Sequence, residues 1–187
     1  MAAKLSASPA TYGDIDALPA NMVGEIVQGT LYATPRPAAL HARAASTLGE
    51  ELGPPFNRGR GGPGGWIILD EPELHFGDEV VVPDLAGWRR QRMPELPQVA
   101  FFTLAPDWLC EVLSPSTAAL DRGKKLPLYA RVNVAHVWLV DPIAKTLEVL
   151  RLDGATYRLI ATESGDTKVR AEPFEAIELE LGALWAR

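Results

Sequence analysis

Residues 79–88 read EVVVPDLAGW, and this stretch decides how the chain is interpreted. Its apolar β-branched residues are typical of a buried strand. Pro83 interrupts the strand, because proline has no N–H to donate and is confined to edges, bulges and breaks. Asp84 then places a carboxylate among apolar residues, where an unpaired charge is costly to bury. The stretch predicts a strand that bends beside Asp84 and leaves space for a cation, although Asp84 could also simply end a strand.

The segments before this stretch show turn signals and helix periodicity. We expect a hairpin over 25–34 with its turn at Gln28-Gly29, and an amphipathic helix over 37–52 with Leu40, Ala44, Leu48 and Leu52 on one face. The glycine-rich segment 58–65 lacks the GK[ST] ending of a phosphate-binding loop and indicates a mobile loop. Strands over 65–76 and 79–88 should form a second hairpin at Gly77-Asp78.

The segments after it add a central strand and a second helix. Residues 107–115, DWLCEVLSP, are a continuous apolar run, which favours a strand covered on both faces. We expect a polar turn from residue 116 and then a helix to about Val132 with Pro127 in its first turn. Strands should follow from His136 to the C-terminus, including the alternating stretch 174–181. This order predicts a mixed α/β fold, with a central sheet flanked by helices.

Composition limits the classes of protein to consider. The chain has 187 residues, 47% of them apolar, which is enough for one globular domain over 1–187. It shows no membrane-spanning run and no secretory signal, and its lone cysteine excludes a disulfide framework. We therefore expect a cytoplasmic protein without membrane association. The net charge of −6 argues against a nucleic-acid coat protein, although basic residues cluster in the middle of the chain.

A second carboxylate sits in an apolar strand. Glu111 shares one face of its strand with Leu109 and Leu113, so it too needs a partner if it is buried. Two acids brought together from neighbouring strands would form a hard-oxygen site of the kind that Mg²⁺ or Mn²⁺ prefers. A structural salt bridge from Glu111 to an arginine is the alternative interpretation.

A lysine follows on the helix after Glu111. Asp121, Lys125 and Tyr129 lie at positions i, i+4 and i+8, so they share one helix face. Lys125 could then neutralise charge on a scissile phosphate or orient an attacking water, while a metal supplies Lewis acidity. In isolation, however, a pair such as Asp121 and Lys125 is most often a solvated helix pair.

Three other side chains are weaker candidates. Glu73, in preference to Glu71, could add a third metal ligand from the hairpin strand that precedes Asp84. His41 lies near the start of the first helix and could approach the acids, although a structural or surface role is the simpler interpretation. Catalysis by a nucleophilic serine would need a GxSxG elbow, which the sequence lacks.

Three motifs resemble those of a known family. They are VVVPDLAGW (80–88), DWLCEVLSPST (107–117) and DRGKKLPLYARVNVAHVWLVDP (121–142), and they resemble the Uma-two family of bacterial proteins. This family is placed in the PD-(D/E)XK, restriction-endonuclease-like superfamily. The resemblance covers about residues 20–152 and implies a core of order α-β-β-β-α-β with a central mixed sheet. It leaves additional N-terminal strands and a C-terminal strand extension over 153–187.

The resemblance also implies roles for individual residues. Asp84 matches the acid of the Pro-Asp motif and Glu111 the second acid, with the backbone carbonyl of Val112 as a further metal ligand. The usual motif has a lysine two residues after the second acid, where this chain has Leu113. The lysine is thereby implied to lie on the following helix as Lys125, supported by its neighbours Asp121, Lys124 and Tyr129.

The predicted function follows from this resemblance. Members of the superfamily use Mg²⁺ or Mn²⁺ to hydrolyse phosphodiester bonds, usually in DNA, so we expect a metal-dependent endonuclease. The sheet edges and an apolar C-terminal strand further favour a homodimer. Two alternatives stay open, namely a catalytically inactive nuclease-fold module that binds nucleic acid or protein, and an enzyme that uses the same metal site on another substrate. The acidic net charge and the missing in-strand lysine motivate the inactive module.

Overall fold

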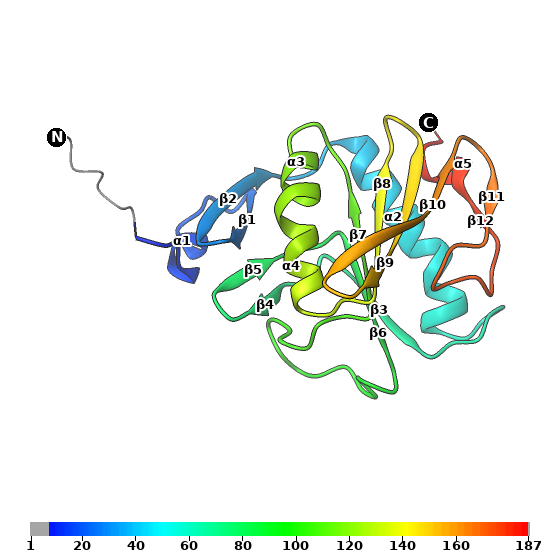
Figure 1. Ribbon diagram of the computed structural model, residues 1–187, viewed down its shortest axis with the longest axis horizontal. Helices are drawn as coiled ribbons and strands as arrows, with labels where there is room; N and C mark the ends of the chain where they lie inside the picture. Colours follow the sequence, from blue (N-terminus) through cyan, green and yellow to red (C-terminus); the bar gives the residue numbers. More distant parts are fainter. Residues whose placement is uncertain (1–7, 187) are drawn as a thin grey trace.

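The break at Pro83 divides one long hairpin between two sheets (Figure 1). The computed structural model describes residues 8–186. The hairpin consists of β3 (Trp66–Asp70), β4 (Leu74–Phe76), β5 (Glu79–Val81) and β6 (Leu85–Arg89). β4 pairs with β5 across the tight turn at Gly77, whereas β3 pairs with β6 in the larger sheet. The predicted hairpin at Gly77-Asp78 is therefore confirmed, but its two ends belong to different sheets.

The larger sheet has six strands and is mixed. Its order is β10-β9-β8-β7-β6-β3. Besides β3 and β6, it contains β7 (Trp108–Val112), β8 (His136–Asp141), β9 (Thr146–Asp153) and β10 (Thr156–Ser164). β7 and β8 are parallel, while the other pairs are antiparallel. All five residues of β7 are buried, so the central strand predicted from the apolar run is confirmed.

The smaller sheet brings the N-terminal hairpin to the strand break. α1 (Tyr12–Asp16) leads into β1 (Met22–Val27) and β2 (Thr30–Pro35), and the sheet order is β2-β1-β5-β4. Gln28 and Gly29 both have positive φ, which is typical of the two-residue turn predicted here. Ile26 of β1 pairs with Val80 of β5. This long-range pairing places β1 directly beside the segment that carries Asp84.

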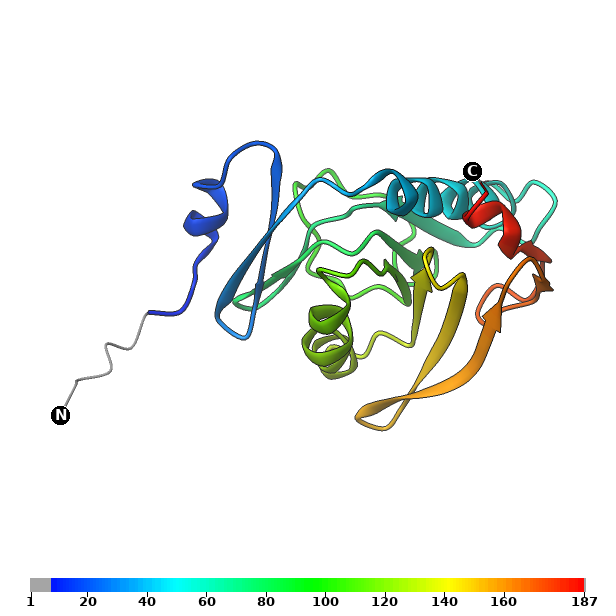
Figure 2. The ribbon, with the colours of Figure 1, turned by 90° about the horizontal axis from the view of Figure 1, so that it is seen from above.

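Helices cover the two faces of the larger sheet (Figure 2). α2 (Ala39–Leu52) continues into a π-helical turn, η1 (Gly53–Asn57), and packs on one face. Ala44, Leu48 and Leu52 are buried as predicted, but Leu40 is 39% exposed, so the apolar stripe begins one turn later. The other face carries α3 (Ala118–Leu120), the π-helical turn η2 (Asp121–Lys125) and α4 (Leu126–Arg131).

The second helical segment is longer and less regular than the pattern predicts. Pro127 lies in the first turn of α4, but helical backbone already begins at Ala118. In η2 the N–H of Leu126 donates to the carbonyl of Asp121, five residues earlier. π-Helical turns of this kind occur frequently at functional sites. Here the turn contains both Asp121 and Lys125.

The C-terminal segment differs from the prediction. The alternating stretch 174–181 contributes only β12 (Leu179–Glu180), which pairs with β11 (Lys168–Val169) and leads into α5 (Leu181–Leu184). Phe174, Leu181 and Trp185 are buried in the same apolar core as α2. The C-terminal segment therefore covers its own chain, and it does not offer an apolar strand for dimerisation. Throughout residues 8–186, no helix combines the length and apolarity needed to cross a bilayer.

Candidate active site

The strand break turns Asp84 towards the end of β7. Asp84 lies between β5 and β6, and its Oδ2 accepts a hydrogen bond of 2.7 Å from the N–H of Val112. Its own carbonyl accepts a hydrogen bond from the N–H of Glu71 at 3.0 Å. These contacts hold the Asp84 carboxylate next to the last residue of the strand that carries Glu111. The two predicted acids therefore meet at the same end of the larger sheet.

Glu111 is buried on the face of β7 that α4 covers. The residue is 3% exposed, and its Oε1 accepts hydrogen bonds from the Tyr129 hydroxyl and, at 2.8 Å, from Lys125 Nζ. Burial raises the pKa of Glu111 well above its usual value, and the nearby acids Asp121, Glu25 and Asp84 add to this rise against the opposing charge of Lys125. Without a further positive charge, Glu111 thus takes up a proton more readily than an ordinary carboxylate.

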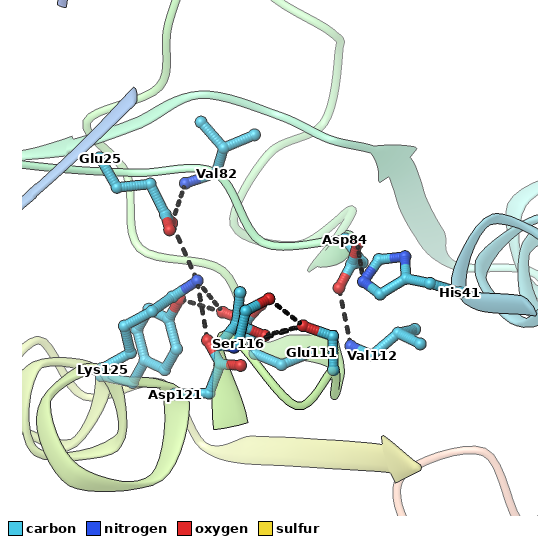
Figure 3. A network of polar contacts seen from close by, with 12 residues as sticks. Glu25, His41, Val82, Asp84, Glu111, Val112, Ser116, Asp121 and Lys125 are labelled. Atoms are coloured by element: carbon cyan, nitrogen blue, oxygen red, sulfur yellow. Dashed lines mark hydrogen bonds and ion pairs between the residues drawn. The ribbon is translucent and has the colours of Figure 1, made fainter. Parts of the chain in front are cut away.

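Lys125 is the centre of a buried charge network (Figure 3). Its Nζ lies 2.8 Å from Glu25 Oε1, 2.8 Å from Glu111 Oε1 and 3.4 Å from Asp121 Oδ1. Although burial alone lowers the pKa of Lys125, the charges of Glu111 and Glu25 outweigh it and raise the pKa well above its usual value. An ammonium group has three N–H donors, so Lys125 directs all of them to carboxylates.

Glu25 also belongs to this network, although it is not among the site residues predicted from the sequence. Besides pairing with Lys125, its Oε1 accepts a hydrogen bond of 2.9 Å from the N–H of Val82, within the strand break. Glu25 thereby connects the backbone next to Pro83 to the lysine. Its signal was the same as for Asp84 and Glu111, since it is an acid in a strand whose neighbours Ile26 and Val27 are apolar.

His41 reaches the site from the first turn of α2. Its Nε2 lies 3.3 Å from Asp84 Oδ1. Burial alone lowers the pKa of His41, but the contact with the Asp84 carboxylate and its charge contribute most to outweighing burial, and the pKa is raised. A protonated His41 therefore balances part of the charge on Asp84. The structure places this histidine at the acids, not on the surface.

These residues line a cavity of about 70 Å³ that carries excess negative charge. Among its lining residues are Glu25, His41, Glu71, Asp84, Glu111, Val112, Asp121 and Lys125. The carboxylates outnumber the positive groups, and carboxylate and carbonyl oxygens are the ligands that Mg²⁺ and Mn²⁺ prefer. Within the part of the chain that is described, no three acidic, histidine or cysteine side chains are grouped closely enough to hold a metal ion. Two carboxylates with a backbone carbonyl and water still fit Mg²⁺, which keeps several of its waters.

Two predicted residues lie elsewhere. Glu73 does not line the cavity, since its Oε1 accepts a hydrogen bond from Tyr12 at 2.9 Å and lies 2.7 Å from His75 Nε2. Glu71 lines the cavity instead, because its φ of 46° breaks the alternation between β3 and β4. Lys124 points away from Lys125, since its ammonium donates to the Tyr32 hydroxyl and lies 5.1 Å from the centre of that ring.

Comparisons with known proteins assign the chain to a family. The family model described as "Uma2: Putative restriction endonuclease" matches residues 14–182. A solved structure of "a putative nuclease belonging to DUF820 from Anabaena variabilis ATCC 29413" has a TM-score of 0.74 and 24% sequence identity, covering 95% of this chain and 98% of that one. At this identity the structural likeness shows a shared fold, and no curated protein matches the sequence. The three motifs around Asp84, Glu111 and Lys125 thus lie within a matched region that spans most of the chain, and the chain belongs to the Uma2 restriction endonuclease family.

Proposed function

We propose that this chain is a divalent-metal-dependent endonuclease that hydrolyses phosphodiester bonds in DNA. The observation that carries the proposal is the hydrogen bond from the Val112 N–H to Asp84 Oδ2. It ties the first acid to the end of the strand that bears Glu111, so both acids line one cavity with Lys125. An acid at the strand break before β6, an acid on the neighbouring β7 and a lysine from the next helical segment match the order of the family motifs.

A Mg²⁺ or Mn²⁺ ion would be held by Asp84, Glu111 and the backbone carbonyl of Val112, with Glu71 close by. Such an ion supplies Lewis acidity and lowers the pKa of a coordinated water. The excess of carboxylates in the cavity supports this assignment, because buried carboxylates without a counterion are costly.

The remaining residues position these groups. Lys125 and Tyr129 orient Glu111 through its Oε1, while Glu25 and Asp121 hold Lys125 in place. To touch a substrate phosphate, Lys125 has to release one carboxylate, and the contact with Asp121 is the longest of the three at 3.4 Å. Lys125 thus offsets part of the charge of the acid cluster in the free protein and can turn a donor to the phosphate when substrate enters.

Cleavage of plasmid and single-stranded DNA, with Mn²⁺ and with EDTA, tests the proposal. We expect cutting by the wild type only with metal, and none by Asp84→Asn or Glu111→Gln. Glu73→Gln is the matched control, because it removes one acid outside the cavity and should cut at the wild-type rate. Metal-dependent cutting that survives in Asp84→Asn would show that the nuclease centre lies elsewhere. Metal and DNA binding without any cutting would favour the inactive module.

We also propose a single domain over 1–187, with the core at about 20–152 and the extension at 153–187. The burial of Phe174, Leu181 and Trp185 against α2 supports this, because the extension completes the same apolar core. A single calorimetric unfolding transition is the expected result, and two separated transitions would contradict it. A homodimer and a cytoplasmic location stay predictions. The expectation of a dimer rests on the sheet edges alone, because the C-terminal segment packs against its own chain.

A further inference from the structure

A second and larger cavity adjoins the acidic one. It has a volume of about 490 Å³, within the usual range for small-molecule sites. One wall is formed by Tyr32 and Thr34 of β2, and the other by Ser116, Thr117 and Lys124 around α3. Thr34 and Thr117 line both cavities, so the two are direct neighbours. A molecule that reaches the acids can therefore extend into this neighbouring space.

Lys124 brings a positive charge to this cavity, whereas the adjoining cavity is rich in acids. Across residues 8–186, no carboxylate lies within 4.0 Å of its ammonium, whereas the adjacent Lys125 contacts three. Its polar partner is the hydroxyl of Tyr32. Lys124 therefore retains a positive charge that no acid neutralises, next to a centre rich in acids. An anionic group of the substrate, such as a phosphate, would be attracted to this side of the site.

Tyr32 adds an aromatic surface to the same cavity. Its ring is only partly buried and lies beside Lys124. Proteins that bind single strands combine such rings, on which bases stack, with basic groups that follow the backbone. The hydroxyls of Ser116 and Thr117 are exposed or half-buried at the cavity wall and each lies 3.0 Å from the Ser114 hydroxyl. They can also donate to a phosphate or sugar oxygen.

We propose that this second cavity binds one unpaired nucleotide of the substrate, next to the bond that is cut. The base lies against Tyr32 and the phosphate is bound by Lys124. The assignment rests on the proposed nuclease function for the position of the cut. A base inside a duplex is stacked and paired, and it cannot enter a side cavity unless it is flipped out. The preferred substrate is therefore single-stranded or locally unpaired DNA.

Binding in EDTA tests the cavity separately from cleavage. The probe is a fluorescently labelled 12-nucleotide oligothymidylate, compared with a duplex of the same length by fluorescence anisotropy. We expect Lys124→Ala and Tyr32→Ala each to weaken binding of the single strand about tenfold, from the usual contribution of one phosphate or stacking contact. Tyr32→Phe keeps the ring and should bind within about twofold of the wild type. Lys168→Ala is the control for charge, because it removes one exposed lysine on β11, away from both cavities.

The outcomes separate this proposal from the proposed function. If Lys124→Ala and Tyr32→Ala melt like the wild type but bind the strand as tightly as Lys168→Ala, the cavity does not hold a nucleotide. Tighter binding of the duplex, or no binding by the wild type, would also overturn the proposal. A wild type that needs Lys124 for binding but does not cut with Mn²⁺ would support the cavity and contradict hydrolysis. Cutting with an unchanged KM in both variants would support hydrolysis and contradict the cavity.

Discussion

The two faces of the six-stranded sheet are packed differently, and β7 shows the contrast within five residues. Trp108, Cys110 and Val112 join the apolar core under α2. Leu109 and Glu111 lie on the other side, where Glu111 meets Lys125 and Tyr129 of the second helical segment. One strand therefore contributes alternately to an apolar core and to a charged network.

The face under α2 is dominated by aromatic rings. Phe174 lies 4.6–5.5 Å, between ring centres, from Phe56, Trp66, Trp108 and Trp138. The buried charged side chains of residues 8–186 all lie at the acid cavity instead, and they are Glu25, Glu111, Asp121 and Lys125. The α2 face is therefore packed with apolar and aromatic side chains, while the opposite face combines an apolar cluster with buried charge at the candidate site.

The largest expected effect on stability comes from the aromatic face. Phe174→Ala should lower the free energy of unfolding by about 3–5 kcal/mol, because it leaves a cavity among four aromatic rings. Urea unfolding measures this loss, and cleavage per folded molecule should stay at the wild-type level. Phe101→Ala is the control, because Phe101 is 38% exposed and should cost less than about 1.5 kcal/mol. Equal losses in the two variants would remove the distinction between the faces.

Breaking the charged network should come next. Lys125→Met leaves buried carboxylates without their cation, which should cost about 3 kcal/mol and abolish cleavage. Adding Glu111→Gln to this variant removes one of those carboxylates and should restore part of the stability but none of the activity. The coupling is read from urea unfolding of the two single variants and the double variant. Additive losses would mean that Lys125 and Glu111 do not interact energetically.

Glu25 should affect chemistry more than stability. Glu25→Gln weakens the contact that holds Lys125 but also removes one negative charge from an overcharged cluster, so the unfolding free energy should change by no more than about 1 kcal/mol. We expect kcat for cleavage to fall about tenfold with little change in KM, because Lys125 loses its orientation. Glu95→Gln, on the exposed loop after β6, is the control. A rise in KM alone would assign Glu25 to substrate binding.

The smallest expected effect is a pH-dependent stabilisation by metal. The pKa of Glu111 is raised in the folded state, so between the unfolded and folded pKa values the native protein binds more protons and loses stability as pH rises. Mn²⁺ competes with that proton, so it should raise Tm more at pH 8 than at pH 5.5. Thermal melts with and without Mn²⁺ measure the difference, and Glu111→Gln should flatten it. Equal shifts at both pH values would show that metal binding does not involve this carboxylate.

Local sequence patterns were sufficient to predict which residues form much of the candidate site. Asp84 and Glu111 could be found because each places a carboxylate in an apolar strand, where burial without a partner is costly. The spacing of Lys125 and Tyr129 correctly placed both on the helix face that meets Glu111. The preference for Glu73 over Glu71 is not reflected in the cavity, which Glu71 lines, because the positive φ of Glu71 interrupts the alternation on which that preference relied.

By itself, the sequence determined most of the order of strands and helices, the family, and the two acids that meet at the candidate site. These properties depend on neighbours along the chain and on which face of an element is apolar. Only the tertiary structure decided that Glu25 joins Lys125, that His41 lies against Asp84, and that the C-terminal segment is buried under α2. Each of these depends on pairing between distant segments, such as β1 with β5, and hydrophobic periodicity contains no information about which distant strands will meet.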